Sequence, residues 1–507
     1  MFIDLWPMNL PFIVVTTHLV AEQISRATKQ FPYSVGKSPS MRYLRPLTGP
    51  DALVLLDGEE WKGLRKRYNP GFAPSHIATL LPAVVEKVVP FLEHLDRLSE
   101  SGEVVVMGDY TTNVTFDIIG KVTMDMELKA QEPREDRHPV LNTYLDLIET
   151  YKVVEDTPMG GWLLHPINHF QQKWHAYKMR PLLRKVIRDK HAEMMREKES
   201  GSGSAAGKSR SVLALSLQGE EKLSRELVES TIDNLKTFLF AGHDTTSITL
   251  QWTFYELERS PKAAEALHRE LDELFGTDPD PKRVMDVFRE RGEDVMSKMT
   301  YTSAVIKEIL RLYPAGGSAR YTPPNTGLHI RDPKDGKTYC LDGAIVYNCA
   351  TLIQRDEEVY GPTANQFIPE RWIGNSDVSA RTNGGLVDVD SEKAGKGSTG
   401  GIPASAWRPF ERGPRNCIGQ ELANMEAKVL IACVVRRYEF IKVGIGAMKR
   451  NAKGERILGE DGYFETEGEA LYSVSFWSIQ FLFPSSTLFS RVIIRNFHTF
   501  PSLPKGC

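Results

Sequence analysis

The sequence predicts a mainly α-helical protein with a smaller β-rich region. The strongest signal is residues 224–259, which contain no proline and carry apolar side chains at helical spacing. At a rise of 1.5 Å per residue this helix would be about 50 Å long. Further helices are expected at 301–313 and, after a loop rich in glycine and proline, at 420–438. Four short elements complete the pattern, three strands at 12–15, 315–321 and 338–347 and one helix at 20–29.

The composition indicates a globular protein that does not bind nucleic acid. Its 507 residues are 41% hydrophobic and 25% charged, a length that allows two to four ordinary domains or one large one. The net charge of −3 leaves no basic excess to neutralise phosphates. The five cysteines are scattered, odd in number and without a CxxC pair, so neither a disulfide framework nor a zinc site is indicated. A reducing compartment fits best.

One cysteine lies in a distinctive loop, residues 410–419, just before a predicted helix. The helix dipole and the free amides there favour the thiolate, which would be a nucleophile, a redox thiol or a metal ligand. Gly413 allows a sharp turn, Gly419 lets a flat, bulky group approach the backbone, and Arg415 would neutralise an anion beside it. An isolated cysteine is more often a buried structural residue. The pattern F-x-x-G-x-R-x-C-x-G argues against that alternative because it fixes several positions at once.

The long helix carries a second unusual segment, residues 241–246, with the sequence AGHDTT. A glycine in mid-helix costs roughly 1 kcal/mol relative to alanine, but the absence of side-chain bulk leaves room for a ligand. A threonine hydroxyl can bond back to a carbonyl and loosen the helix. An acid, a hydroxyl and a local groove are the components of a proton relay. The alternative is a core helix that tolerates a glycine.

Two weaker patterns complete the set. Residues 57–67 predict a capped, basic helix in which Trp61 and Arg65, four positions apart, share one face. Alone, this is typical of a solvated basic helix with one anchoring tryptophan. Glu308 and Arg311 are spaced i, i+3 on another helix, and such pairs usually lie on solvated faces.

The cysteine loop resembles the haem-binding loop of the cytochrome P-450 superfamily, the haem-thiolate monooxygenases, and the other motifs follow in the order of that family. The resemblance implies the P-450 fold, with haem b between the long helix and the helix after the cysteine loop. It makes Cys417 the axial ligand of the iron. It implies that Asp244 and Thr245 deliver protons, and that Glu308, Arg311 and Arg371 form a buried structural ion-pair network. It also implies a set of other haem-contacting residues: Trp61, Arg65, Gly242, Arg320, Phe410, Arg415 and Gly419.

The resemblance also divides the chain. Residues 1–472 are expected to form the catalytic domain, 200–210 a flexible linker within it, 374–405 a surface insertion and 473–507 a divergent tail. The tail, counted from residue 470, begins with about 20 uncharged residues, enough for a weak membrane-span candidate. Its serines and proline argue against a span, and a divergent or mis-spliced terminus is preferred. The apolar N-terminal run is too short and broken for the membrane anchor of eukaryotic relatives, so the protein is unanchored or the chain starts late.

The expected activity is insertion of one oxygen atom from O2 into a lipophilic small molecule, with electrons from NADPH through NADPH-cytochrome P-450 reductase. Phe238, Phe240, Ala241 and residues 315–319 are expected to line an apolar pocket. A monomer at the cytosolic face of the endoplasmic reticulum is expected by resemblance. The phrasing DLWP near the start and FAGHDTTS resembles fungal relatives that oxidise polyketides or terpenoids in secondary metabolism. Two alternatives remain: a reductase-independent isomerase or dehydratase, and a non-catalytic haem-binding remnant.

Overall fold

A computed structural model describes residues 1–3, 10–155, 166–200, 211–373, 401–468 and 491–496. The predicted linker (all but residue 200), most of the predicted insertion and most of the predicted tail lie outside these residues, as does the DLWP segment.

Helices make up most of the described chain, as predicted. The α-helices are α1 His18–Ser25, α2 Arg45–Thr48, α3 Gly58–Tyr68, α4 Pro74–Thr79, α5 Leu81–Ser101, α6 Met107–Met124, α7 Pro139–Glu155, α9 Pro166–Glu199, α10 Val212–Ser216, α11 Arg225–Arg259, α12 Pro261–Phe275, α13 Pro281–Lys298, α14 Thr300–Leu312, α15 Ala350–Ile353, α16 Glu357–Tyr360 and α17 Gln420–Val434. Short 3-10 helices include η5 Pro369–Trp372 and η8 Gly413–Arg415.

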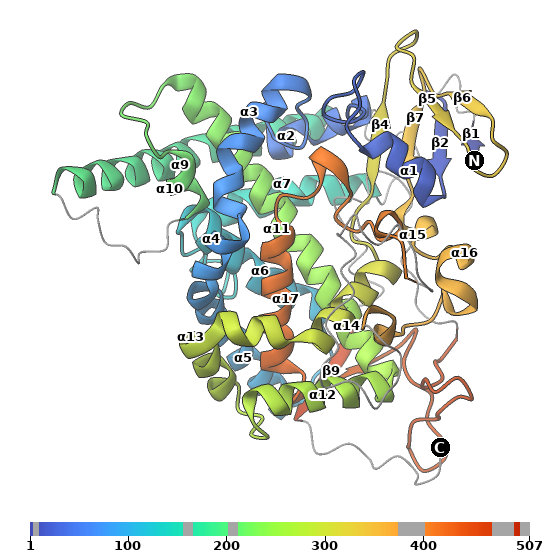
Figure 1. The fold of residues 1–507 in the computed structure, drawn as a ribbon. Helices are drawn as coiled ribbons and strands as arrows, with labels where there is room; N and C mark the ends of the chain where they lie inside the picture. The colour runs from blue at the N-terminus through green and yellow to red at the C-terminus, as the bar shows by residue number, and fades with distance from the viewer. Residues whose placement is uncertain (4–9, 156–165, 201–210, 374–400, 469–490, 497–507) are drawn as a thin grey trace.

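The strands form three small sheets. They are β1 Phe2–Ile3, β2 Phe12–Val15, β3 Val105–Val106, β4 Ser318–Tyr321, β5 His329–Arg331, β6 Thr338–Cys340, β7 Ile345–Asn348, β8 Tyr438–Lys442 and β9 Arg491–Asn496. The largest sheet has the order β1-β2-β7-β4, in which only β2 and β7 are parallel. It lies with α1 at one corner of the molecule, at the upper right of Figure 1, beside the helical part.

The long helix α11 runs through the middle of the helical part, next to α17 (Figure 1). It begins where the sequence predicts, because the Ser224 side chain caps it by accepting a hydrogen bond from the Leu227 N–H at 3.1 Å. Its other main neighbour is α6, against which it packs along much of its length. The two predicted landmark helices, α11 and α17, therefore lie side by side.

The structure departs from the predicted elements at several places: α1 ends at Ser25 rather than at residue 29, and β4 begins at Ser318 rather than at residue 315. The helix expected at 420–438 ends at Val434, and residues 438–442 form β8, whose side chains alternate between buried and half-buried as in a strand. Residues 338–347 contain the two separate strands β6 and β7, and β6 is exposed. Within the region expected to be a divergent tail, residues 491–496 form β9, which pairs with β8 and β3.

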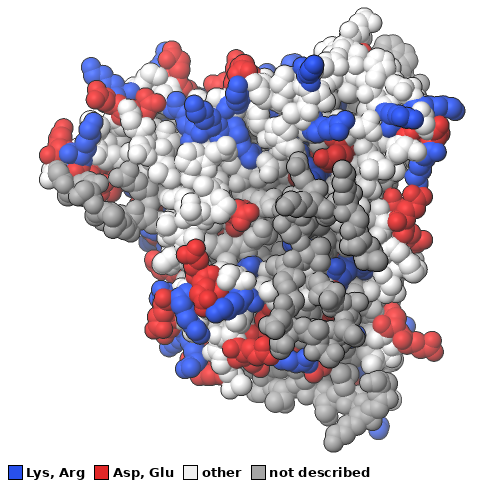
Figure 2. All heavy atoms as spheres, in the orientation of Figure 1, with Lys and Arg blue, Asp and Glu red and all other residues white. Residues whose placement is uncertain are grey.

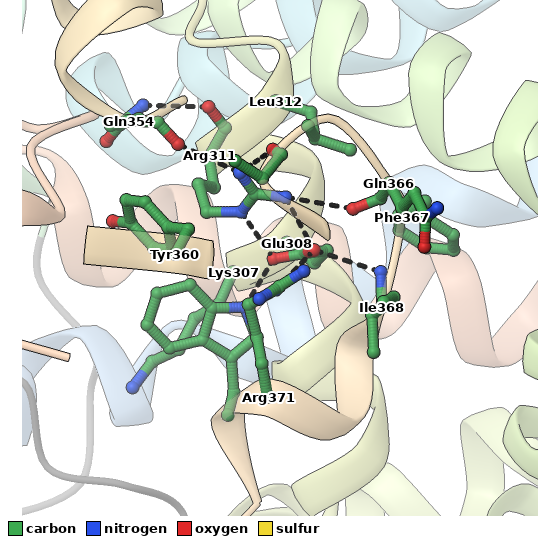
Figure 3. A network of polar contacts seen from close by, with 12 residues as sticks. Lys307, Glu308, Arg311, Leu312, Gln354, Tyr360, Gln366, Phe367, Ile368 and Arg371 are labelled. Atoms are coloured by element: carbon green, nitrogen blue, oxygen red, sulfur yellow. Dashed lines mark hydrogen bonds and ion pairs between the residues drawn. The ribbon is translucent and has the colours of Figure 1, made fainter. Parts of the chain in front are cut away.

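An ion-pair network connects α14 to the segments that precede the cysteine loop (Figure 3). The Glu308 carboxylate accepts two hydrogen bonds from Arg311 and one from Arg371, each at 2.8 Å. It also accepts from the Trp372 indole N–H at 2.8 Å and the Ile368 N–H at 2.9 Å. The glutamate and Arg311 are fully buried, so five donors surround one buried carboxylate.

The same network reaches the backbone of neighbouring segments. Arg311 donates to the carbonyl oxygens of Gln354 at 2.8 Å, Ala364 at 2.6 Å and Gln366 at 2.9 Å. The Gln354 side chain in turn accepts from the N–H of Arg408 at 2.6 Å. Arg408 lies just before the cysteine loop, so this chain of hydrogen bonds fixes the loop's starting point relative to α14.

Among the described residues, no single helix combines the length and hydropathy needed to cross a bilayer. One bent pair, 58–79 with 81–101, meets that criterion by length and composition alone.

We predict that Glu308→Gln lowers the free energy of unfolding by about 3–5 kcal/mol, because it leaves two arginines without their counter-charge in a buried site. The matched control is Glu265→Gln on α12, whose pair with Arg269 is exposed at 3.3 Å and should change stability by less than about 0.5 kcal/mol. Chemical denaturation measures both. Equal effects of the two substitutions would contradict the structural role of the network.

Candidate functional site

A cavity lies between α11 and α17, and the cysteine loop forms part of its wall. Its volume is about 320 Å³, at the lower end of the roughly 300–1,000 Å³ that small-molecule sites commonly measure. Cys417 and Thr245 both line it, which brings together two motifs that are far apart in the sequence.

The cysteine loop is held in a fixed course by its backbone. Gly413 has a φ of +76°, and a Cβ there would lie 2.2 Å from the carbonyl oxygen of Ser25 at the end of α1. Only glycine fits this turn, as the sequence predicted. The Cys417 N–H donates to the carbonyl oxygen of Phe410 at 2.8 Å, which closes the loop. Glu411 also has a positive φ of 57°, an uncommon conformation for a residue with a side chain.

The sulfur of Cys417 faces the cavity. Its side chain is exposed to this space, and a Cβ added to Gly419 would meet only that sulfur, at 3.9 Å. Burial within the protein raises the pKa of the thiol, although the Gly419 N–H and the charge of Arg65 act in the opposite direction. The preference for the thiolate stays a prediction for the protein with a bound group, because desolvation acts against the helix terminus only for the thiol by itself. A metal ion that replaced the proton would reverse this balance.

Arg65 of α3 holds the loop from outside. It donates to the carbonyl oxygen of Asn416 at 2.7 Å and to the Asn416 side chain at 2.9 Å, and its Nε donates to Asn69 at 2.8 Å. Through these bonds the guanidinium positions Asn416, the residue before Cys417. Arg65 also lines the cavity.

Arg415 and Trp61 form the next part of the wall. The guanidinium of Arg415 lies over the indole ring at 4.8 Å and donates to the Asp57 carboxylate and to the carbonyl oxygen of Leu56. Burial lowers the pKa of Arg415 to about 10, with the Asp57 charge opposing. Asp57 precedes α3 but makes no side-chain cap, so the capping expected from sequence is replaced by this ion pair.

Positive charge is concentrated at this end of the cavity. Lys37 lines it and pairs by a backbone bridge with the fully buried Arg320. Burial, together with the charges of Arg320 and Arg415, lowers the pKa of Lys37 well below its usual value. Burial alone would raise the pKa of Glu411, but Arg408 and Arg320 outweigh it and lower that pKa to about 2.

This cluster fits the propionates of the haem that the resemblance implies. In the described part of the chain, Nε and Nη2 of Arg320 and Nε of Arg415 are buried without a hydrogen-bond partner. Buried cationic donors without partners are costly, and carboxylates placed here would satisfy them. Two residues of this cluster, Lys37 and Glu411, were not predicted from the sequence. Lys37 is far from the cysteine loop along the chain, and Glu411 lies within the loop at a position that its pattern does not specify.

The opposite wall is α11. Ala241 and Thr245 are exposed to the cavity, and the Thr245 hydroxyl donates to the Ala241 carbonyl oxygen at 2.9 Å, the back-bond expected from sequence. The helix nevertheless continues without interruption from 225 to 259, so the expected loosening is not present. Asp244 is half-buried and is not among the described residues that line the cavity; its charge instead acts on Tyr144.

Gly242 has a second role beside the one expected from the sequence. It borders the cavity, but a Cβ there would lie 2.6 Å from Cδ1 and Cγ1 of Ile119 on α6. The glycine therefore allows α6 to pack closely against α11. Its immediate purpose is helix contact, and any room for a ligand follows from that contact.

The apolar part of the cavity agrees with most of the residues expected there. Phe238, Ala241 and residues 315–318 line it, whereas Phe240 packs against the core and is not among the described lining residues. One acid, Glu426 of α17, also lines the cavity and was not singled out from sequence. Its burial depends on the contact between α17 and α11, which no local pattern reveals.

Comparison with known proteins identifies the family of this fold. A family model described as "Cytochrome P450" matches residues 1–458. In the crystal structure of the cytochrome P450DA heme domain, 90% of the chain superposes on 98% of this chain with a TM-score of 0.65 and 18% sequence identity. At that identity the likeness concerns the fold alone.

Two fungal relatives are more similar in sequence. Cytochrome P450 monooxygenase acrF of Aspergillus aculeatus is 30% identical over 480 residues, which cover 93% of this chain and 90% of that protein. Cytochrome P450 monooxygenase polC of Polytolypa hystricis is 30% identical over 474 residues, or 92% and 78% of the two chains.

We predict that Gly242→Ala destabilises the protein. The gain in helix propensity, about 1 kcal/mol, is outweighed by overpacking against Ile119, about 1–3 kcal/mol. The control is Gly63→Ala in α3, where an added Cβ meets nothing within 4 Å among the described residues and should stabilise.

Thermal unfolding measures both, and the double variant Gly242→Ala, Ile119→Ala should recover part of the loss attributable to the clash. If Gly242→Ala were as stabilising as the control, close packing of α6 would not explain the glycine.

Proposed function

This chain belongs to the cytochrome P450 family of haem-binding monooxygenases, and on that premise we propose that it binds haem b and inserts one atom of O2 into a lipophilic small molecule. The observation that supports this most directly is the position of Cys417. Its sulfur faces a cavity whose opposite wall carries Ala241 and Thr245, and whose side carries unpartnered arginine donors.

The residues that would hold the haem are those already described. Cys417 would supply the sulfur that binds the iron, Gly419 leaves space beside it, and Arg320, Arg415 and Lys37 would neutralise the propionates. A haem with a thiolate ligand supplies the oxygen-activating chemistry, since the sulfur donates electron density that favours cleavage of the O–O bond. The protein's part is to bind, to orient and to exclude water.

Thr245 is proposed to take part in proton delivery within the cavity. Its hydroxyl is exposed to the cavity and donates a hydrogen bond to the Ala241 carbonyl oxygen. The hydroxyl oxygen can therefore accept a hydrogen bond from a water molecule. Asp244 is adjacent in sequence and half-buried, and in this proposal it is the acid that supplies protons to Thr245. Together they would deliver protons while the cavity remains otherwise apolar.

The substrate is proposed to be a lipophilic secondary metabolite, such as a polyketide or terpenoid. The described lining of the cavity includes many apolar side chains, with Leu53, Val54, Phe238, Ile306 and Leu310 among them. Such walls favour a molecule with few polar groups. The class is tested by screening fungal polyketides and terpenoids for a shift of the haem absorption on binding; a screen that finds only polar ligands would contradict it.

Electrons are proposed to come from NADPH through NADPH-cytochrome P450 reductase. The outward side of α3 carries the exposed Lys62 and Lys66, and basic groups gather over this helix in Figure 2. The same helix holds the cysteine loop through Arg65. An acidic partner that docked on α3 would therefore be close to the proximal side of the site. The protein is proposed to act as a monomer in this complex.

The protein is also proposed to work at the cytosolic face of the endoplasmic reticulum. A stripe of exposed apolar side chains at helical spacing begins α9, namely Ile167, Phe170, Trp174 and Tyr177. The three rings stack in sequence, and Lys178 lies over the indole at 4.9 Å. Aromatic residues with flanking lysines are typical of segments that lie in a membrane interface, which supports this location.

The alternative of a reductase-independent isomerase or dehydratase is not favoured, because both similar fungal proteins are named monooxygenases. A non-catalytic remnant is not favoured either, since the cavity, the cysteine loop and the hydroxyl on α11 occur together.

We predict that the reduced protein with carbon monoxide shows the red-shifted Soret band of thiolate ligation and that Cys417→Ala abolishes the band and all turnover. Cys340→Ala is the control, because that cysteine is exposed on β6, away from the cavity. The Soret bands are measured by absorption spectroscopy of the purified holoproteins. A Soret band typical of histidine ligation, or a thiolate band that persists in Cys417→Ala, would show that Cys417 is not the ligand.

We predict that Thr245→Ala keeps the Soret band but lowers the product formed per NADPH by about tenfold or more, because proton delivery is impaired. Thr253→Ala is a close control, since Thr253 makes the same kind of back-bond on α11, at 2.7 Å to Thr249, but is not among the described residues that line the cavity. Unchanged coupling in Thr245→Ala would exclude this hydroxyl from proton delivery.

A further inference from the structure

One turn of α11 binds the main chain of residues 46–53, and the proposed function gives this turn no role. Its polar side chains are Asp233, Asn234 and Lys236, none of them more than 1% exposed. None is among the described residues that line the cavity. Lys236 donates from Nζ to the carbonyl oxygen of Pro46 at 2.9 Å, and the other two bind further along the same segment. These buried side chains therefore act on a neighbouring segment of backbone.

Asn234 binds a donor and an acceptor of that segment at once. Its side-chain oxygen accepts a hydrogen bond from the Leu53 N–H at 3.0 Å. Its Nδ2 donates to the carbonyl oxygens of Asp51 at 3.1 Å and Ser230 at 2.8 Å. A carboxamide turned by 180° would set its N–H groups against the Leu53 N–H and its oxygen against two carbonyl oxygens. The four partners therefore fix the side chain in one orientation.

Asp233 holds the same segment from the preceding position on α11. One carboxylate oxygen accepts from the Asp51 N–H at 3.1 Å, and the other accepts from Nη1 of Arg180 on α9 at 3.1 Å. The carboxylate lies against Gly49, whose φ is +92°, and a Cβ there would lie 2.0 Å from Cγ of Asp233. Only glycine permits this approach. Two helices and the segment thus meet at one buried carboxylate.

The bound segment ends in the cavity wall. Leu53 and Val54 line the cavity, and the N–H of Leu53 is the group that Asn234 holds. On α11, Thr237 and Phe238 line the same cavity one turn after Asn234. A hydrogen bond to the main chain positions a residue whatever its side chain is. Asn234 therefore sets how far these two parts of the wall stand from each other.

We propose that Asn234 is a positioning residue that determines the size selectivity of the cavity by fixing Leu53 and Val54, with Asp233 as its partner. The inference rests on the proposed monooxygenase function, because it takes the cavity as the place of a lipophilic substrate. Connecting segments are commonly mobile and can move to admit a ligand. Here, movement would leave buried backbone groups without partners, which is costly. A molecule too large for the cavity thus meets a wall that resists displacement.

The first test is amide hydrogen exchange of the haem-loaded full-length protein, measured by mass spectrometry on peptides that cover residues 49–56. We expect exchange there to be slow without a ligand and to change by less than about twofold when N-phenylimidazole binds, because the buried bonds already hold the segment. The exposed residues 451–455 serve as the reference for rapid exchange. Rapid exchange at 49–56 that becomes slow on binding would reveal a wall that closes over its ligand, and would overturn the proposal without any variant.

The second test compares azoles of different size, whose ring nitrogen binds haem iron and shifts the haem absorption. Imidazole and N-tritylimidazole are titrated into the wild type and into Asn234→Ala. Loss of the carboxamide releases Leu53, so we expect the ratio of the trityl to the imidazole dissociation constant to fall by at least about fivefold. The dissociation constant of imidazole itself should stay within about twofold, because this small ligand does not press on the wall. The same ratio in both proteins would overturn the proposal.

Two further variants separate positioning from a general loss of stability. Asn142→Ala on α7 removes another carboxamide that donates to a backbone carbonyl, that of Arg134 at 2.9 Å, and Asn142 is not among the described lining residues. Its ratio should equal that of the wild type, and a fall as large as in Asn234→Ala would contradict the proposal. Asn234→Asp keeps an acceptor for the Leu53 N–H but loses the Nδ2 donors, so its ratio should lie between those of wild type and Asn234→Ala.

Failure of the inference is distinguishable from failure of the proposed function. A wild type that binds no haem, or whose haem absorption does not respond to imidazole, would contradict the proposed function. A wild type that binds both azoles with the same ratio as Asn234→Ala would leave that function intact and exclude Asn234 from size selectivity.

Discussion

The site depends on how the loop before Cys417 is held between α1, α3 and α17. The turn at Gly413 lies against the backbone of α1, Arg65 binds Asn416 from α3, and the Cys417 N–H closes on Phe410. These contacts fix the backbone on both sides of the sulfur, so that the side chain faces the cavity. The sulfur is exposed to the cavity and is therefore accessible to a metal ion there.

Charge is distributed unevenly around the cavity that this loop completes. At one end, Lys37, Arg320 and Arg415 crowd together with buried donors that lack partners. Along α17, burial raises the pKa of the Glu426 carboxyl to about 8. The lining also includes many apolar side chains. The cationic end suits the anionic edge of the proposed cofactor, and the apolar lining suits a lipophilic ligand.

The sequence was most informative where a function needs residues close together in the chain. The cysteine loop, the segment 241–246 and the helix bounds at 225–259 are local patterns, and the structure places all of them around one cavity. It was least informative for Lys37, whose place beside Arg320 depends on pairing between distant segments.

Local patterns also misled where tertiary contacts compete with them. Asp57 has the spacing of a helix cap but pairs with Arg415. Gly242 serves contact with Ile119, and Tyr438 begins a strand because residues 491–496 pair beside it. The most direct test of the central claim is X-ray absorption at the iron edge of the purified ferric protein. The account predicts one sulfur among the atoms bound to iron; a shell of nitrogen and oxygen alone would contradict it.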